Sequence, residues 1–147
     1  MSARALATVI AACSFALTGC STTAEERLQR RIDALLPEQA RQSGDCDWAS
    51  GFVENAPASL TCRYLVDGQV KAVDAIVREN LRAQGYGLHS RARARGAPTV
   101  RLFSARREDY VASIGLVAPG DPLDWQLDTT PVPAGSVGIF VALTERG

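Results

Sequence analysis

From Tyr86 to Leu143 the chain is a succession of short runs in which apolar or small side chains alternate with polar ones. A period of two places alternate side chains on opposite faces of an extended strand. The alternating positions are Tyr86, Leu88, Ser90, Ala92 and Ala94; Val100 and Leu102; Tyr110, Ala112, Ile114 and Leu116; Leu123, Trp125 and Leu127; and Val137, Ile139, Val141 and Leu143. Glycine, proline or charged residues that favour turns separate these runs. Short strands joined in this way predict an antiparallel sheet.

Two earlier segments have helical rather than extended spacing. Residues 24–36 follow a capping-box pair, Thr23 and Glu26, and Pro37 ends or kinks the helix, with a further turn expected to about Gln42. Residues 70–84 form a second predicted helix that ends at Gly85. Their apolar faces carry Leu28, Ile32, Leu35, Leu36, Val73, Ile76, Val77 and Leu81. Residues 59–66 alternate as a half-buried strand does.

This order of elements predicts an α+β domain in two layers, with one or two helices packed on a mostly antiparallel sheet of about four to six strands. If strand 59–66 pairs in parallel with a later strand, the crossover should be right-handed. Residues 123–128 favour a strand, although Asp121 and Pro122 also suit the start of a short helix. No repeat or linker divides the segment after residue 24, which predicts a single domain.

The first residues differ from the rest of the chain. Arg4 is the only charged residue before Glu25, and an uncharged, largely apolar stretch runs from Ala5 to Leu17. A helix of that length covers roughly 20 Å, which is short of a hydrocarbon core of about 30 Å. A cationic start, a short apolar middle and small residues after it are typical of a secretory signal rather than a membrane-spanning helix.

Leu17, Thr18, Gly19 and Cys20 follow that stretch directly, and they resemble the lipobox of bacterial lipoproteins. The resemblance implies that residues 1–19 are a signal peptide, removed by signal peptidase II, and that the Cys20 sulfur carries a diacylglycerol. Residues 20–147 would then be one envelope domain with a short tether, exported and facing away from the cytoplasm. The anchor would hold it to the cell membrane or outer membrane, where two acyl chains bind far more firmly than one.

Two cysteines remain after the leader and the lipidated residue are set aside. Cys46 and Cys62 form an even pair in a chain exported to an oxidising compartment, which favours a disulfide. Closing a loop of about sixteen residues would contribute roughly 3 kcal/mol. A redox pair or metal site is the alternative, but two thiolates provide only half of a tetrahedral site. We predict no metal and no cofactor.

The most suggestive polar feature is a row of arginines. In a strand over 86–95, Arg91, Arg93 and Arg95 share one face at intervals of nearly 7 Å, which favours an anionic partner. The alternatives are a solvated face, an edge whose charge discourages strand pairing, or neutralisation by Asp124 and Asp128. The chain as a whole is electrically balanced, with 16 basic and 16 acidic residues, which argues against nucleic-acid binding.

The remaining candidates for chemistry are isolated. His89 is the only histidine, and the sequence holds no motif of a serine hydrolase, zinc protease or Ser-x-x-Lys enzyme. Asp45 and Asp47 do not have calcium-loop spacing, and neither do Asp121, Asp124 and Asp128. Trp48, Phe52 and Trp125 are predicted as core aromatics, with an exposed binding platform as the alternative.

These observations favour a non-catalytic lipoprotein that binds or helps to assemble another envelope component. Its partners would be the membrane, through the lipid, together with an envelope protein or an anionic envelope component. Two alternatives belong to other classes of function. One is a carrier of a hydrophobic ligand held between helices and sheet; the other is an envelope hydrolase that uses a cleft joining His89 to carboxylates.

Overall fold

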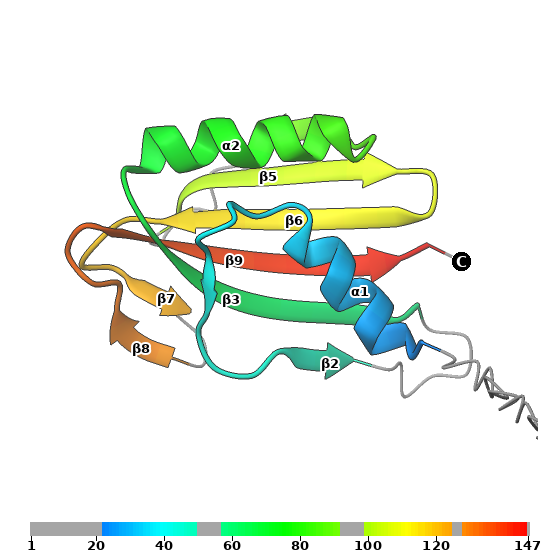
Figure 1. The fold of residues 1–147 in the computed structure, drawn as a ribbon, viewed down its shortest axis with the longest axis horizontal. Helices are drawn as coiled ribbons and strands as arrows, with labels where there is room; N and C mark the ends of the chain where they lie inside the picture. Colours follow the sequence, from blue (N-terminus) through cyan, green and yellow to red (C-terminus); the bar gives the residue numbers. More distant parts are fainter. Residues whose placement is uncertain (1–21, 50–56, 92–98, 125–127, 147) are drawn as a thin grey trace, which may run out of the picture.

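The computed structural model describes residues 22–49, 57–91, 99–124 and 128–146 (Figure 1). In these segments two helices pack on one face of a mostly antiparallel sheet, so the predicted α+β, two-layer class is confirmed. The helices are α1 (Ala24–Asp33) and α2 (Val70–Ala83). The strands are β1 (Arg41–Gln42), β2 (Asp47–Ala49), β3 (Ser59–Asp67), β4 (Gly87–Arg91), β5 (Thr99–Arg107), β6 (Tyr110–Val117), β7 (Pro122–Asp124), β8 (Asp128–Pro131) and β9 (Ser136–Glu145).

The main sheet has the strand order β1-β3-β9-β6-β5-β4, and β2 also pairs with β3. Strand β3 pairs antiparallel with β9, so the conditional parallel crossover does not arise. The last strand of the chain, β9, therefore lies in the middle of the sheet. On one side it pairs with β3, which also pairs with β1 and β2, and on the other side it pairs with the β4–β5–β6 meander. The predicted strands that correspond to β3, β5, β6 and β9 are confirmed, with β5 and β9 each slightly longer than the alternation indicated. Of the strand predicted over 86–95, the structure shows β4, and residues 92–95 lie outside the described residues.

The core lies between the sheet and the helices, as Figure 1 shows from the side of the helices. Helix α1 crosses β3 and β9, and α2 lies along β4, β5 and β6. The two helices bury the predicted apolar stripes, with Ile76 as an exception that remains exposed. The buried helical side chains are Leu28, Ile32, Val73, Val77 and Leu81.

The opposite face of the sheet is covered at one end by the β7–β8 hairpin. Leu123 and Val132 from this hairpin form a second small core with Val117, and Leu65 packs against it. Gly138 in β9 lies beneath the hairpin, and a Cβ placed there would be 2.5 Å from Leu123 Cδ1 and 2.8 Å from Val132 Cγ2. Glycine at this position therefore allows the hairpin to approach the sheet.

Two local predictions need correction. The further helical turn expected to about Gln42 is wrong, because Arg41 and Gln42 form strand β1 and pair with Leu65 and Tyr64. After Pro37 the chain makes one turn, in which Ala40 N–H donates to the Pro37 carbonyl, and then pairs with the edge of β3. For residues 123–128 the favoured strand, rather than the alternative helix, is found at Leu123 and Asp124 in β7. A single continuous strand is wrong, because Asp124 of β7 pairs antiparallel with Asp128 of β8. Residues 125–127 lie outside the described residues.

Candidate functional site

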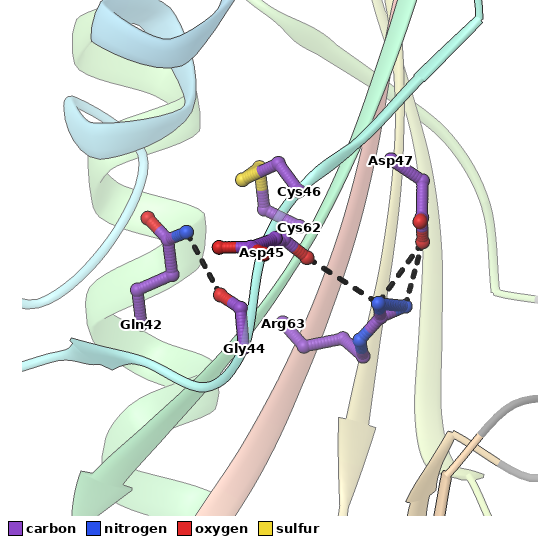
Figure 2. Close-up of polar contacts among 7 residues, drawn as sticks. All are labelled: Gln42, Gly44, Asp45, Cys46, Asp47, Cys62 and Arg63. Carbon is purple, nitrogen blue, oxygen red and sulfur yellow. Dashed lines mark hydrogen bonds and ion pairs between the residues drawn. A yellow bond between two sulfur atoms is a disulfide. The ribbon is translucent and has the colours of Figure 1, made fainter.

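The N-terminal edge of the sheet is closed by the predicted disulfide, which is confirmed. Residues Asp47 and Thr61 are paired in β2 and β3, so Cys46 and Cys62 lie opposite each other one position farther along. Their sulfurs are bonded, and their Cα atoms are 4.4 Å apart (Figure 2). The bond therefore joins neighbouring strands at a position where their backbones already lie close together.

Helix α1 rests on this disulfide through Gln29. Gln29 Oε1 lies 3.1 Å from Cys46 Sγ and 3.4 Å from Cys62 Sγ. These are packing contacts rather than hydrogen bonds, because the sulfurs of a disulfide carry no proton. On its other side the Gln29 amide donates to Tyr64 Oη at 2.7 Å and to Asp33 Oδ1 at 3.0 Å. The helix, the crosslink and β3 thus form one connected unit.

The outer side of the same edge carries an ion pair. Both terminal nitrogens of Arg63 donate to Asp47 Oδ2, at 2.9 and 3.0 Å, and one also lies 3.4 Å from the carbonyl oxygen of Asp45 (Figure 2). Gln42 donates to the carbonyl of Gly44 across the preceding turn. The Asp47 carboxylate, expected to be solvated, therefore ties β2 to β3.

A second polar cluster lies at the C-terminal end of α2, where a Schellman motif ends the helix. Tyr86 N–H donates to the Leu81 carbonyl, and Gly85, at φ +79°, donates to Arg82. This turn buries the Tyr86 ring in the core, where it is 4% exposed. The Tyr86 hydroxyl has no hydrogen-bond partner within the described parts of the chain.

Two arginines and a second tyrosine belong to the same region of the helix-covered face. Arg31 of α1 lies over the Tyr110 ring, with its Cζ 4.2 Å from the ring centroid. Arg107 is paired with Tyr110 across β5 and β6, and it donates to the Gln84 carbonyl at 3.2 Å. Burial raises the pKa of Tyr86, while the charges of Arg31 and Arg107 act in the opposite direction. We call Arg31, Tyr86, Arg107 and Tyr110 the Arg–Tyr cluster.

The sequence did not indicate this cluster, because its members come from α1, the end of α2 and the β5–β6 turn. Spacing along the chain carries no information about pairs so far apart. The only local signal was Gly85, which marked the end of α2 and therefore the position from which Tyr86 turns into the core.

The arginine row remains a prediction. Arg91 is the last residue of β4, which is the edge strand of the sheet, whereas Arg93 and Arg95 lie outside the described residues. His89 is exposed on the same strand, and no hydrogen bond or ion pair joins it to a carboxylate in the part of the chain that the structure describes. The structure therefore does not bring His89 into a catalytic arrangement there.

The other predicted residues are distributed as follows. Trp48 is half-buried in β2 and packs against the core, while Phe52, Trp125 and Cys20 lie outside the described residues. Among the described residues, no group of three or more His, Cys, Asp or Glu side chains could hold a metal ion. The described helices include none that is long and apolar enough to span a bilayer.

Comparisons with protein-family models, with curated proteins and with solved structures found no match to this chain.

Proposed function

We propose that this chain is a membrane-anchored envelope lipoprotein whose exported domain binds or helps to assemble another envelope component, without catalysis of its own. The observation that carries the proposal is the short distance between the predicted anchor and the folded domain. Cys20 is followed by only two residues before Thr23, the N-cap of α1. A tether of this length spans at most roughly 11 Å, so the domain would stay close to the bilayer surface.

The start of α1 is firmly attached to the rest of the domain. Thr23 and Glu26 form the predicted capping box, with reciprocal hydrogen bonds of 3.1 and 3.2 Å. Leu28 and Ile32 are fully buried, and Gln29 contacts the disulfide that crosslinks the start of β2 to β3. A pull on the tether is therefore transmitted to the sheet within two helical turns. This arrangement suits a module held at a fixed height above a membrane.

Binding through the surface fits the observed core better than enclosure of a ligand does. Side chains from both helices and the sheet fill the layer between them. Leu28, Leu35, Val77, Leu81, Ile114 and Ile139 each have an exposed fraction of 0%. We therefore place the binding function on the exterior of the domain, with the arginine row as one candidate contact for an anionic component.

The anchor is tested by the mass of the N-terminal peptide after expression of the full chain in a bacterial host. We expect a peptide that starts at Cys20 and carries a diacylglyceryl group, and a membrane-bound protein. Cys20→Ala is the matched control and should keep its leader. A mature terminus at another residue, with a free Cys20 thiol, would contradict the proposal. Cross-linking in intact cells, with wild-type protein and Cys20→Ala compared, then identifies partners that depend on the anchor.

A further inference from the structure

The Arg–Tyr cluster lies at the end of the domain where α1 begins. Arg27, in the first turns of α1, contacts Glu145 at the end of β9, and Glu145 is paired with Tyr110. Arg146 N–H donates to the Asp109 carbonyl in the β5–β6 turn. Figure 1 shows the start of α1, the end of β9 and the β5–β6 turn on the same side of the molecule. The described chain begins here, at Thr22, so the predicted lipid tether would join the domain at this end.

The cluster has unused hydrogen-bond donors. Neither Arg31 nor Arg107 forms an ion pair with a carboxylate of the described segments, and a guanidinium has five N–H donors. Arg107 uses one donor on Gln84, and Arg31 presents its face to Tyr110. Tyr86 follows Gln84, the residue that Arg107 contacts, by two positions, and its hydroxyl is buried and unpaired among the described residues, an uncommon state for a polar group in a folded protein.

We propose that the Arg–Tyr cluster binds a phosphate group, with Arg31 and Arg107 as the charged donors and the Tyr86 hydroxyl as a third donor. A tetrahedral phosphate offers oxygens in several directions, which suits donors carried by different elements, here α1, β5 and the end of α2. Planar guanidinium groups match such oxygens in pairs. The hydroxyl is closed to solvent, so binding requires neighbouring side chains to shift.

Phospholipid headgroups are the source of phosphate that the tether would bring closest. This part of the inference rests on the proposed lipoprotein function, whereas the site itself rests only on the described side chains. Free phosphate or a soluble phosphate ester would use the same chemistry. Vesicles and inorganic phosphate therefore form separate arms of the test.

The test uses the mature chain, residues 20–147, with Cys20→Ser, so that no acyl chain contributes to vesicle binding. Removal of the leader takes no residue from the described core, which begins at Leu28. Binding is measured by calorimetry with inorganic phosphate and by co-sedimentation with phosphatidylglycerol and phosphatidylcholine vesicles. The variants are Arg31→Gln, Arg107→Gln and Tyr86→Phe. Arg30→Gln is the matched control, because it removes the same charge from an exposed position of the same helix.

We expect Arg31→Gln and Arg107→Gln each to weaken binding by about tenfold or more, as the loss of a charged hydrogen bond does, while Arg30→Gln leaves it within about twofold. Tyr86→Phe should weaken binding by about fivefold without lowering the melting temperature, since it removes an unpaired buried hydroxyl. Binding in either arm with this pattern supports the site, and the arm identifies the source of phosphate.

Two results would overturn the proposal. One is the absence of binding to both phosphate and phosphatidylglycerol vesicles by a protein that melts normally. The other is an equal loss in Arg30→Gln and Arg31→Gln, which would mean that only net charge matters. Unchanged affinity in Tyr86→Phe would remove the hydroxyl from the site. None of these results bears on the mass of the N-terminal peptide, so the lipoprotein proposal is tested independently.

Discussion

The two helices are held to the sheet by different means. Helix α1 is bound by a covalent and polar unit in which Gln29 contacts the Cys46–Cys62 disulfide and hydrogen-bonds Tyr64. Helix α2 packs on the sheet through Val73, Val77 and Leu81, and Arg78 lies over the Phe103 ring at 4.9 Å. Its Asn80 amide donates to the carbonyls of Leu35 and Leu36, which follow α1, rather than to the sheet. The polar group at its end, the Tyr86 hydroxyl, has no partner among the described residues.

The two buried tyrosines near these helices differ in the same way in their hydrogen bonding. Near α1, Tyr64 satisfies its hydroxyl with Gln29 and Asp33, and the network adds to the stability of the fold. Near the end of α2, an equally buried tyrosine remains unpaired beside two arginines. A group that costs stability without a structural return is a candidate for function. The contrast therefore separates a side of the domain whose buried hydroxyl is satisfied from a side where we propose binding.

The largest expected effect is on the α1 side. Reduction of the Cys46–Cys62 disulfide should lower the free energy of unfolding by about 3 kcal/mol, because the unfolded chain regains the entropy of its open loop. Urea titrations with and without a thiol reductant measure the change. Hydrogen exchange should accelerate more in β2 than in α2, because the disulfide is attached at Cys46, next to β2, and does not involve α2. Equal acceleration in both would contradict the proposed division.

The next effect compares a glycine of β9 that lies beneath the β7–β8 hairpin with a glycine of the edge strand β4. Gly138→Ala should destabilise the domain by about 2 kcal/mol, since its Cβ would meet Leu123 and Val132 at less than contact distance. Gly87→Ala, on the edge strand β4, is the matched control, because its nearest neighbours would be 3.7 Å away. We expect less than about 0.5 kcal/mol for the control. Similar losses in the two variants, measured by urea unfolding, would exclude the close approach of the β7–β8 hairpin.

The smallest effect concerns the two buried tyrosines at alkaline pH. Burial raises the pKa of Tyr64 and of Tyr86 above the ordinary value of 10.0, and the Asp33 charge adds to the shift at Tyr64. Each protonated hydroxyl thus contributes stability that is complete below that value and is lost as the pH rises through the folded-state pKa. One unit above the ordinary pKa, the loss from Tyr64 should be about 1.4 kcal/mol, and Tyr86 should add a loss in the same direction.

Unfolding free energies at about pH 8 and pH 11 test this expectation. Tyr64→Phe should remove about 1.4 kcal/mol of the alkaline decrease, and Tyr86→Phe should remove a further part, because each variant lacks one of the two titrating groups. A free energy of unfolding that stays constant across this range would show that the hydroxyls are not desolvated. A decrease that survives in both variants would assign the titration to other groups.

Local sequence signals predicted a large part of the fold. The capping pair Thr23 and Glu26 marked the start of α1, and Gly85 marked the end of α2. Alternation identified β3, β6 and β9, and the even cysteine pair indicated the disulfide. Strands β1 and β2 were missed because two and three residues are too few to show a period, and their pairing depends on the edge of β3.

By itself, the sequence determined which segments are helices or long strands and which cysteines pair. It also showed that the first twenty residues resemble the signal peptide and lipobox of bacterial lipoproteins. Each of these depends on residues close in the chain or on a count, so neighbouring side chains carry the information. Only the tertiary structure decided that β9 lies at the centre of the sheet and that Arg31, Tyr86, Arg107 and Tyr110 meet. Such meetings depend on how helices settle on a sheet, because packing energy is shared among many distant residues and leaves no local pattern.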